Sequence, residues 1–100
     1  MMVQQKEEDK KMTKKQQGMK WMYDRATASS LNQVYKNCSY AKQRSFDAIR
    51  WEMATNGGYD LRITGHNAMM YSCAYRYKGV DGLEHLRYFT KANTFDFPIN

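Results

Sequence analysis

Short runs of alternating apolar and polar residues fill the second half of the chain. Residues 59–64, 68–78, 84–90 and 94–99 each have a period of two, which is typical of strands with one packed and one solvated face. Turn-forming residues separate the runs, at Gly65-His66-Asn67, residues 79–82 and residues 91–93. The pattern predicts a four-stranded antiparallel sheet. Pro98 cannot donate to a ladder, so the last strand is expected at an edge.

Helical spacing dominates the first half. Met19, Met22 and Tyr23 recur at helical intervals within residues 14–26, and Thr13 can cap this helix with Gln16 as its capping-box partner. A longer apolar stripe runs over residues 31–53. It fits either one helix over residues 30–55 or a short helix followed by a helix over residues 39–55, and a cap at residue 39 favours the second. The glycines at residues 57–58 end it.

These elements predict an α+β fold in which the N-terminal helices pack on one face of the sheet, in two layers. Phe46, Ile49 and Met53 are expected to pack on the strand residues Leu61, Ile63, Tyr71 and Tyr75. One hundred residues make a single domain. Residues 1–12 are expected to be a flexible basic tail and residues 13–100 the domain.

The net charge of +6 is uneven, with +3 on residues 1–25, +2 on residues 26–58 and +1 on residues 59–100. No apolar stretch approaches the ~20 residues that span a bilayer, and no apolar signal segment opens the chain. A cytoplasmic protein without a membrane partner is therefore expected. Cys38 and Cys73 lie far apart on apolar stripes, which indicates core positions rather than metal ligands. Neither a metal nor another cofactor is expected.

His66 and His85 are the histidines of the chain and therefore the first candidates for acid–base chemistry. His66 follows Gly65 directly after a strand, and over residues 46–77 this arrangement resembles small toxin ribonucleases with a double-stranded-RNA-binding-like fold. The resemblance implies a catalytic role for His66. That family usually has several histidines together at this place. This chain departs from it, since a single histidine stands here before Asn67. A turn histidine in water is the simpler interpretation, and no enzyme is predicted.

Basic and aromatic residues suggest a binding surface instead. The middle helices carry cations that can neutralise phosphates or contact a partner, and the uncovered sheet face is expected to carry arginines with an exposed aromatic. The candidate residues are Lys36, Lys42, Arg44 and Arg50 on the helices, and Arg62, Met70, Arg76, Lys78, Arg87 and Phe89 on the sheet.

Residues 34–97 resemble small accessory proteins of bacteriophages and mobile elements, anti-CRISPR proteins among them. Three stretches carry the resemblance, residues 37–46, 56–67 and 86–93. It implies a non-enzymatic inhibitor in a bacterial host cell that binds a host protein or nucleoprotein, such as a defence nuclease, and blocks it sterically. The basic balance departs from the acidic DNA-mimicking members. Direct DNA or RNA binding is the alternative, a ribonuclease that uses His66 is the second alternative, and the sequence leaves a homodimer open.

Overall fold

The computed structural model describes residues 12–26, 30–66 and 71–99. The first helix described is α2 (Lys14–Arg25). Thr13 caps it as predicted, because its side chain accepts from the backbone N–H of Gln16 and the Gln16 side chain accepts from the backbone N–H of Thr13 in return. This reciprocal pair satisfies two of the N–H groups that a helix start leaves open.

The middle of the chain forms α3 (Ser30–Asn37) and α4 (Tyr40–Thr55). The predicted break is confirmed, since the Ser39 side chain accepts from the backbone N–H of Lys42 and starts a new helix. Gly57 follows the helix with φ of 66°, a conformation that glycine adopts without strain. The predicted end of α4 is therefore confirmed as well.

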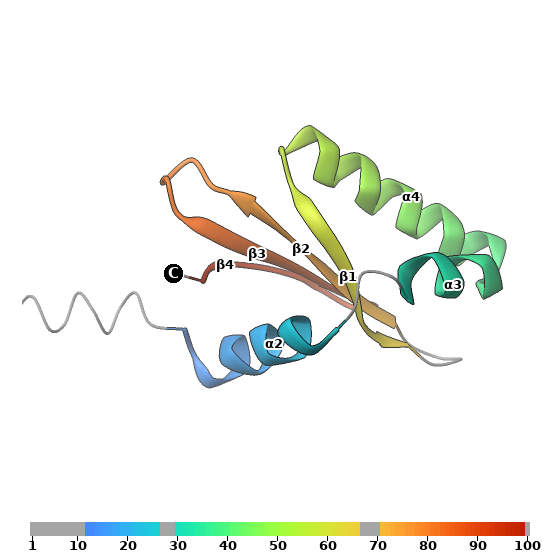
Figure 1. Ribbon diagram of the computed structural model, residues 1–100, viewed down its shortest axis with the longest axis horizontal. Coiled ribbons are helices and arrows are strands. Elements are labelled where there is room, and N and C mark those ends of the chain that lie inside the picture. The colour runs from blue at the N-terminus through green and yellow to red at the C-terminus, as the bar shows by residue number, and fades with distance from the viewer. Residues whose placement is uncertain (1–11, 27–29, 67–70, 100) are drawn as a thin grey trace, which may run out of the picture.

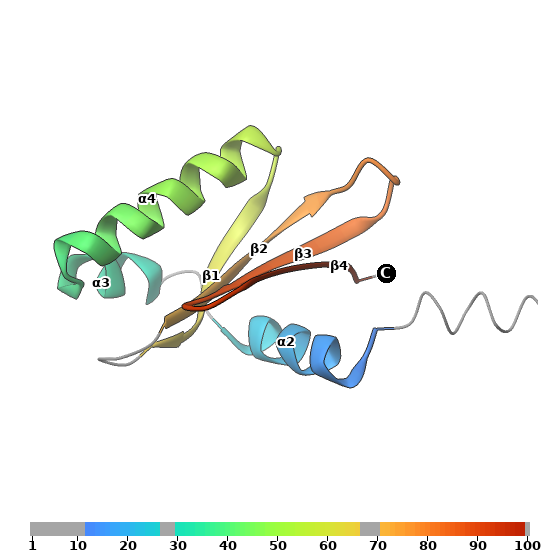
Figure 2. The same cartoon turned by 180° about the vertical axis from the view of Figure 1, so that it is seen from behind.

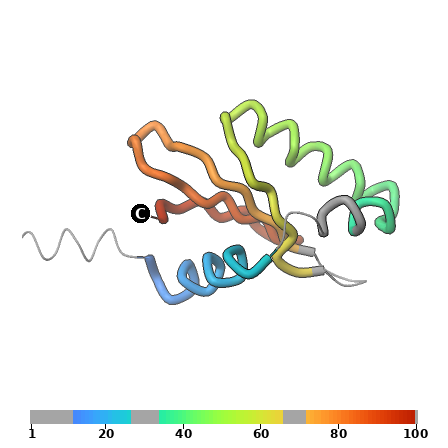
Figure 3. The backbone as a smooth tube through the Cα atoms, viewed as in Figure 1, coloured from blue at the N-terminus to red at the C-terminus, as the bar shows by residue number. Residues whose placement is uncertain are grey.

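The sheet has the order β1-β2-β3-β4, so that each strand pairs with the next one along the chain (Figure 3). The strands are β1 (Tyr59–His66), β2 (Tyr71–Lys78), β3 (Glu84–Thr90) and β4 (Thr94–Pro98), and all their pairings are antiparallel. Pro98 ends β4 at the edge, as predicted. The α+β class with a four-stranded antiparallel sheet is confirmed.

Both faces of the sheet are covered, which corrects the expected two layers. On one face, α4 and α3 pack on β1 and β2 around a core that contains Phe46, Ile49, Leu61, Ile63 and Tyr75. On the opposite face, α2 packs on the later strands (Figures 1 and 2). The reason is that the strands carry apolar residues on both sides, and the second core consists of Met19, Tyr23, Ala74, Leu86, Tyr88 and Phe97.

Strand β1 departs from the predicted alternation at its start. Asp60 has φ of 62°, and the pairing with β2 shifts between Tyr59 and Arg62. This irregularity turns the Tyr59 side chain to the α2 face, where its hydroxyl donates to Glu84. Tyr59 therefore does not share a face with Leu61, as the alternation had predicted.

Several predictions fall at the ends of the described ranges. Gly65 and His66 belong to β1 and not to a turn. Asn67, Met70 and residues 1–11 of the expected tail lie outside the described residues, as do the side chains of His66 and Tyr71. Met12, which the sequence assigned to the tail, packs against the second core.

Candidate interaction surface

The outer face of α4 carries large exposed aromatic side chains. Tyr40 is 75% exposed and Trp51 is 78% exposed. With Arg44 and Ala48, both exposed, they recur at intervals of three or four residues and therefore form one stripe. Phe46 faces the other way, into the core. We call these four residues the α4 outer face.

The predicted helical cations do not gather on that face. Arg44 lies there, with its guanidinium 6.0 Å from the centre of the Tyr40 ring. Arg50 instead lies over the Tyr35 ring of α3, at 5.2 Å. Lys42 is two residues before Arg44 and so points about 200° away around the helix. Lys36 is exposed on α3, so the four cations do not make one continuous basic surface.

Arg62 connects β1 to the C-terminal end of α2. Its guanidinium pairs with Asp60 at 2.9 Å and donates to the carbonyl oxygens of Tyr23 at 3.1 Å and Ala26 at 3.3 Å. It also lies 4.7 Å from the centre of the Tyr23 ring. These contacts consume the donors that a ligand would need, so Arg62 has a structural role here.

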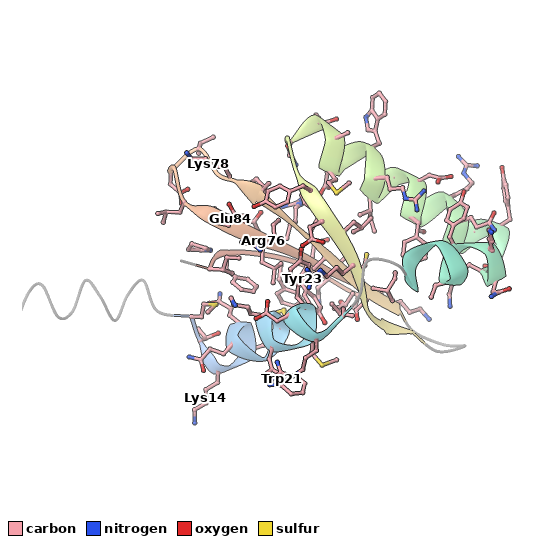
Figure 4. All side chains as sticks on the ribbon, viewed as in Figure 1. Lys14, Trp21, Tyr23, Arg76, Lys78 and Glu84 are labelled. Carbon is pink, nitrogen blue, oxygen red and sulfur yellow. The ribbon has the colours of Figure 1, made fainter. Side chains whose placement is uncertain are left out.

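The other predicted sheet residues are divided between the two faces. Arg76 pairs with Glu84 at 3.1 Å on the α2 side (Figure 4). Arg87 lies on the α4 side, where it pairs with Glu52 at 2.6 Å and Asp96 at 3.0 Å. Lys78 is exposed at the end of β2.

The predicted exposure of Phe89 is wrong. The sequence predicted an exposed aromatic on an open sheet face, but Phe89 is 8% exposed and belongs to the core under α4. It pairs with Cys73 of β2, which is also in that core. The register places Phe89 on the covered side, where it cannot stack on a base.

His85 occupies a polar cluster on the same side of the sheet as Arg87. Its Nδ1 lies 2.8 Å from Asp96 and its Nε2 lies 2.8 Å from Asp81, and its ring is 5.3 Å from that of Tyr77. Burial alone lowers the pKa of His85, but the hydrogen bonds to Asp96 and Asp81 and their charges outweigh it and raise the pKa above its ordinary value. A protonated ring donates to both carboxylates.

The members of this cluster pair with one another. A general base needs a ring nitrogen within reach of the substrate proton, and both nitrogens of His85 are occupied by carboxylates. Glu84, its neighbour in sequence, pairs with Arg76 instead. Burial raises the pKa of the Cys73 thiol to about 12, so that thiol is not a nucleophile at neutral pH. Over the described ranges no group of His, Cys, Asp and Glu side chains could hold a metal ion.

The chain matches no protein-family model, no curated protein and no solved structure in these comparisons. Site and function therefore rest on this chain's own residues. In the part of the chain that is described, no helix has the length and apolarity to cross a membrane. The ribonuclease hypothesis stays a prediction, since the His66 side chain lies outside the described part.

Sequence reasoning missed the exposed tryptophans. Trp51 lies opposite the apolar stripe of α4, and Trp21 lies off the apolar face of α2, where it is 54% exposed. The signal was available in the spacing, because each tryptophan falls on the helix face that the core-forming residues leave free.

Proposed function

We propose that this protein is a non-catalytic interaction protein that binds a partner protein through the α4 outer face. The observation that carries the proposal is the exposure of Trp51 at 78% and of Tyr40 at 75% on the same face of α4, about three turns apart. Leaving two large aromatic rings in water gives up the free energy that their burial would contribute. Neither ring is needed by the fold, since the opposite side of α4 forms the core.

The composition of this face matches that of binding hot spots. Tryptophan, tyrosine and arginine are the residues most enriched at the energetic centres of protein interfaces, and Trp51, Tyr40 and Arg44 share the face. The expected partner surface has an apolar pocket for the indole and a carboxylate for the guanidinium. The charged sheet residues support this assignment indirectly, because Arg62, Arg76 and Arg87 are occupied by ion pairs.

The kind of partner comes from the sequence resemblance to phage accessory proteins. We propose a host defence protein or nucleoprotein, such as a CRISPR nuclease, in the cytoplasm of a bacterial cell. The protein would act by occupying the partner's working surface. Steric blocking needs binding affinity and no catalytic group. This agrees with the pairing of both His85 ring nitrogens with carboxylates.

The test is reconstitution with purified defence nucleases. We expect one of them to form a complex of defined stoichiometry, measured by light scattering after gel filtration, that survives about 1 M salt because apolar contacts are little screened. Trp51→Ala should weaken that complex by about 30-fold or more, corresponding to a hot-spot loss of about 2 kcal/mol or more. The same variant should keep its unfolding free energy within about 0.5 kcal/mol of the wild type.

Val80→Ala is the matched control, because Val80 is a fully exposed apolar residue on the turn after β2. It should leave the complex unchanged. The proposal fails if Trp51→Ala and Tyr40→Ala bind the nuclease as tightly as the wild type. It also fails if the wild type sediments as a dimer that Trp51→Ala dissociates, since the face would then serve a second copy of the chain.

A further inference from the structure

The most basic segment of the chain runs through α2, directly after the acidic residues 7–9. Residues 10–25 carry six Lys or Arg against Asp24 alone, a net of +5, and the rest of the chain contributes +1. Lys20 pairs with Asp24 at 2.8 Å, so even that acid is neutralised locally. Within this segment α2 itself carries four Lys or Arg against Asp24, a net of +3, and a basic helix attracts polyanions.

The exposed side of α2 combines this charge with an aromatic ring. Lys14, Gly18, Trp21 and Arg25 are all exposed and recur at intervals of three or four residues, so they form one stripe, the α2 outer face. Lys14 and Trp21 project away from the sheet in Figure 4, whereas Tyr23 points toward it. The Arg25 guanidinium stacks 3.7 Å from the centre of the Trp21 ring, so cation and ring are held together.

Gly18 in the middle of this stripe has no explanation within the fold. A Cβ built at Gly18 would meet nothing within 4 Å, in contrast to Gly58, where it would collide with Tyr75. Glycine weakens a helix interior, and nothing in the described structure requires it at this position. An absent side chain next to Trp21 does allow a ligand backbone to approach the helix closely.

We propose that the α2 outer face binds single-stranded nucleic acid. Lys14 and Arg25 are placed to contact phosphates at the two ends of the stripe, and an unpaired base would stack on the face of the Trp21 ring opposite Arg25. Gly18 leaves room for the sugar–phosphate backbone between them. The stripe is about 16 Å long at a rise of 1.5 Å per residue, which accommodates a few nucleotides. A duplex offers no free base face to the indole, which is why the proposal specifies single strands.

The experiment measures fluorescence anisotropy of labelled 12-residue oligo(dT), oligo(U) and a 12-base-pair duplex with the full chain. We expect the single strands to bind more tightly than the duplex. Their affinity should fall between ~50 and ~200 mM salt, with a slope of about −1.4 for two phosphates on a single strand. Trp21→Ala should weaken single-strand binding by about 10-fold, the loss of one stacked base. In a Trp51→Phe background Trp21 is the remaining tryptophan, so the oligonucleotide should quench its fluorescence.

Two comparisons separate a site from simple charge attraction. Lys14→Gln should weaken binding several-fold, whereas Lys78→Gln removes the same charge from the end of β2 and should not. Gly18→Ala should raise the midpoint of thermal unfolding and yet weaken binding, a combination that a purely structural residue cannot produce. Four results would each overturn the proposal. Lys14→Gln and Lys78→Gln could weaken binding equally, or Trp21→Ala could leave binding unchanged. The duplex could bind as tightly as the single strands, or no binding could be detected at ~50 mM salt.

This inference is independent of the proposed partner of α4. Trp51→Ala should leave the oligonucleotide affinity unchanged, and Trp21→Ala should leave the protein complex unchanged. Each variant therefore reports on its own surface, and the failure of one proposal is distinguishable from the failure of the other.

Discussion

Replacing Arg62 with methionine should loosen α2 from the sheet. The change keeps the apolar stem of the side chain but removes the guanidinium that pairs with Asp60 and donates to the carbonyl oxygens of Tyr23 and Ala26. Those carbonyls lie at the C-terminal end of α2, where the helix leaves acceptors without partners and where a positive charge is favourable. The effect should therefore concentrate on α2.

The magnitude follows from three contacts. A cation at a helix C-terminus contributes about 0.3–1 kcal/mol, or more in a partly buried geometry. The Asp60 pair is about one quarter exposed on both sides, so it contributes about 0.5–1 kcal/mol. The guanidinium above the Tyr23 ring, at 4.7 Å, adds about 0.5–1 kcal/mol. Because neighbouring contacts are not additive, we expect a total loss of about 2 kcal/mol.

Urea unfolding followed by circular dichroism measures the total, and hydrogen exchange locates it. Amides of α2 should lose protection in Arg62→Met while those of α4 keep theirs, because α4 packs on the opposite face. Arg76→Met is the matched control, since Arg76 holds one ion pair at 37% side-chain exposure and should lose less than about 1 kcal/mol. Equal losses in the two variants, or exchange that rises uniformly over the sheet, would refute the assigned role of Arg62.

Three further outcomes follow from the described contacts. The pKa of His85 is raised in the folded state, so the stabilisation by this residue is complete below about pH 6.5 and is lost as pH rises through the folded pKa. The unfolding free energy should therefore fall from pH 6 to 9. His85→Gln should flatten that fall in urea titrations. Gly18→Ala should raise the unfolding free energy by about 1 kcal/mol, seen in calorimetry as a midpoint about 4–8 °C higher. The buried thiol of Cys73, whose pKa is raised to about 12, should resist iodoacetamide at pH 8 while the half-buried Cys38 reacts, and mass spectrometry of the native protein would detect a contrary order.

Local signals in the sequence predicted the elements of this fold. Thr13 and Ser39 begin helices and Gly57 follows the end of one, since each offers the hydrogen bond or the backbone conformation that a helix boundary needs. The contact of Phe46 and Ile49 with β1 was also predictable. The boundaries follow from capping chemistry and the contact follows from periodicity, and a single sequence records both directly.

The arrangement of the helices around the sheet was not predictable in the same way. The apolar stripe of α2, with Met19 and Tyr23, would fit either face of a sheet whose strands carry apolar residues on both sides. Register decides the matter, because Leu86 pairs with Phe97 and both then face α2. Register depends on contacts between residues far apart in the chain. The positive φ of Asp60, which turns Tyr59 to the same face, has only a weak marker, since aspartate tolerates this conformation better than most residues do but here interrupts an otherwise regular alternation.

The burial of Phe89 and the ion pairs of the sheet arginines were not predictable for a related reason. Arginines on a strand suggest a solvated face that could bind a ligand. In the structure Arg62, Arg76 and Arg87 each form an ion pair with an acidic residue elsewhere in the fold. Pairing of this kind cannot be read from charge alone, since it depends on which side chains converge. Among the predicted sheet cations, Lys78 is exposed at the end of β2 while the three arginines are held in ion pairs.

The two exposed helix faces lie on opposite sides of the sheet (Figure 1). If both proposals hold, a partner protein on α4 and a nucleic-acid strand on α2 would bind without competing. We expect the effects of Trp21→Ala and Trp51→Ala to add within about 0.5 kcal/mol, the usual result for distant sites. Isothermal titration of the double variant with oligonucleotide and with the partner measures this directly. A coupling well above that limit would mean that the two faces contact one continuous ligand rather than two.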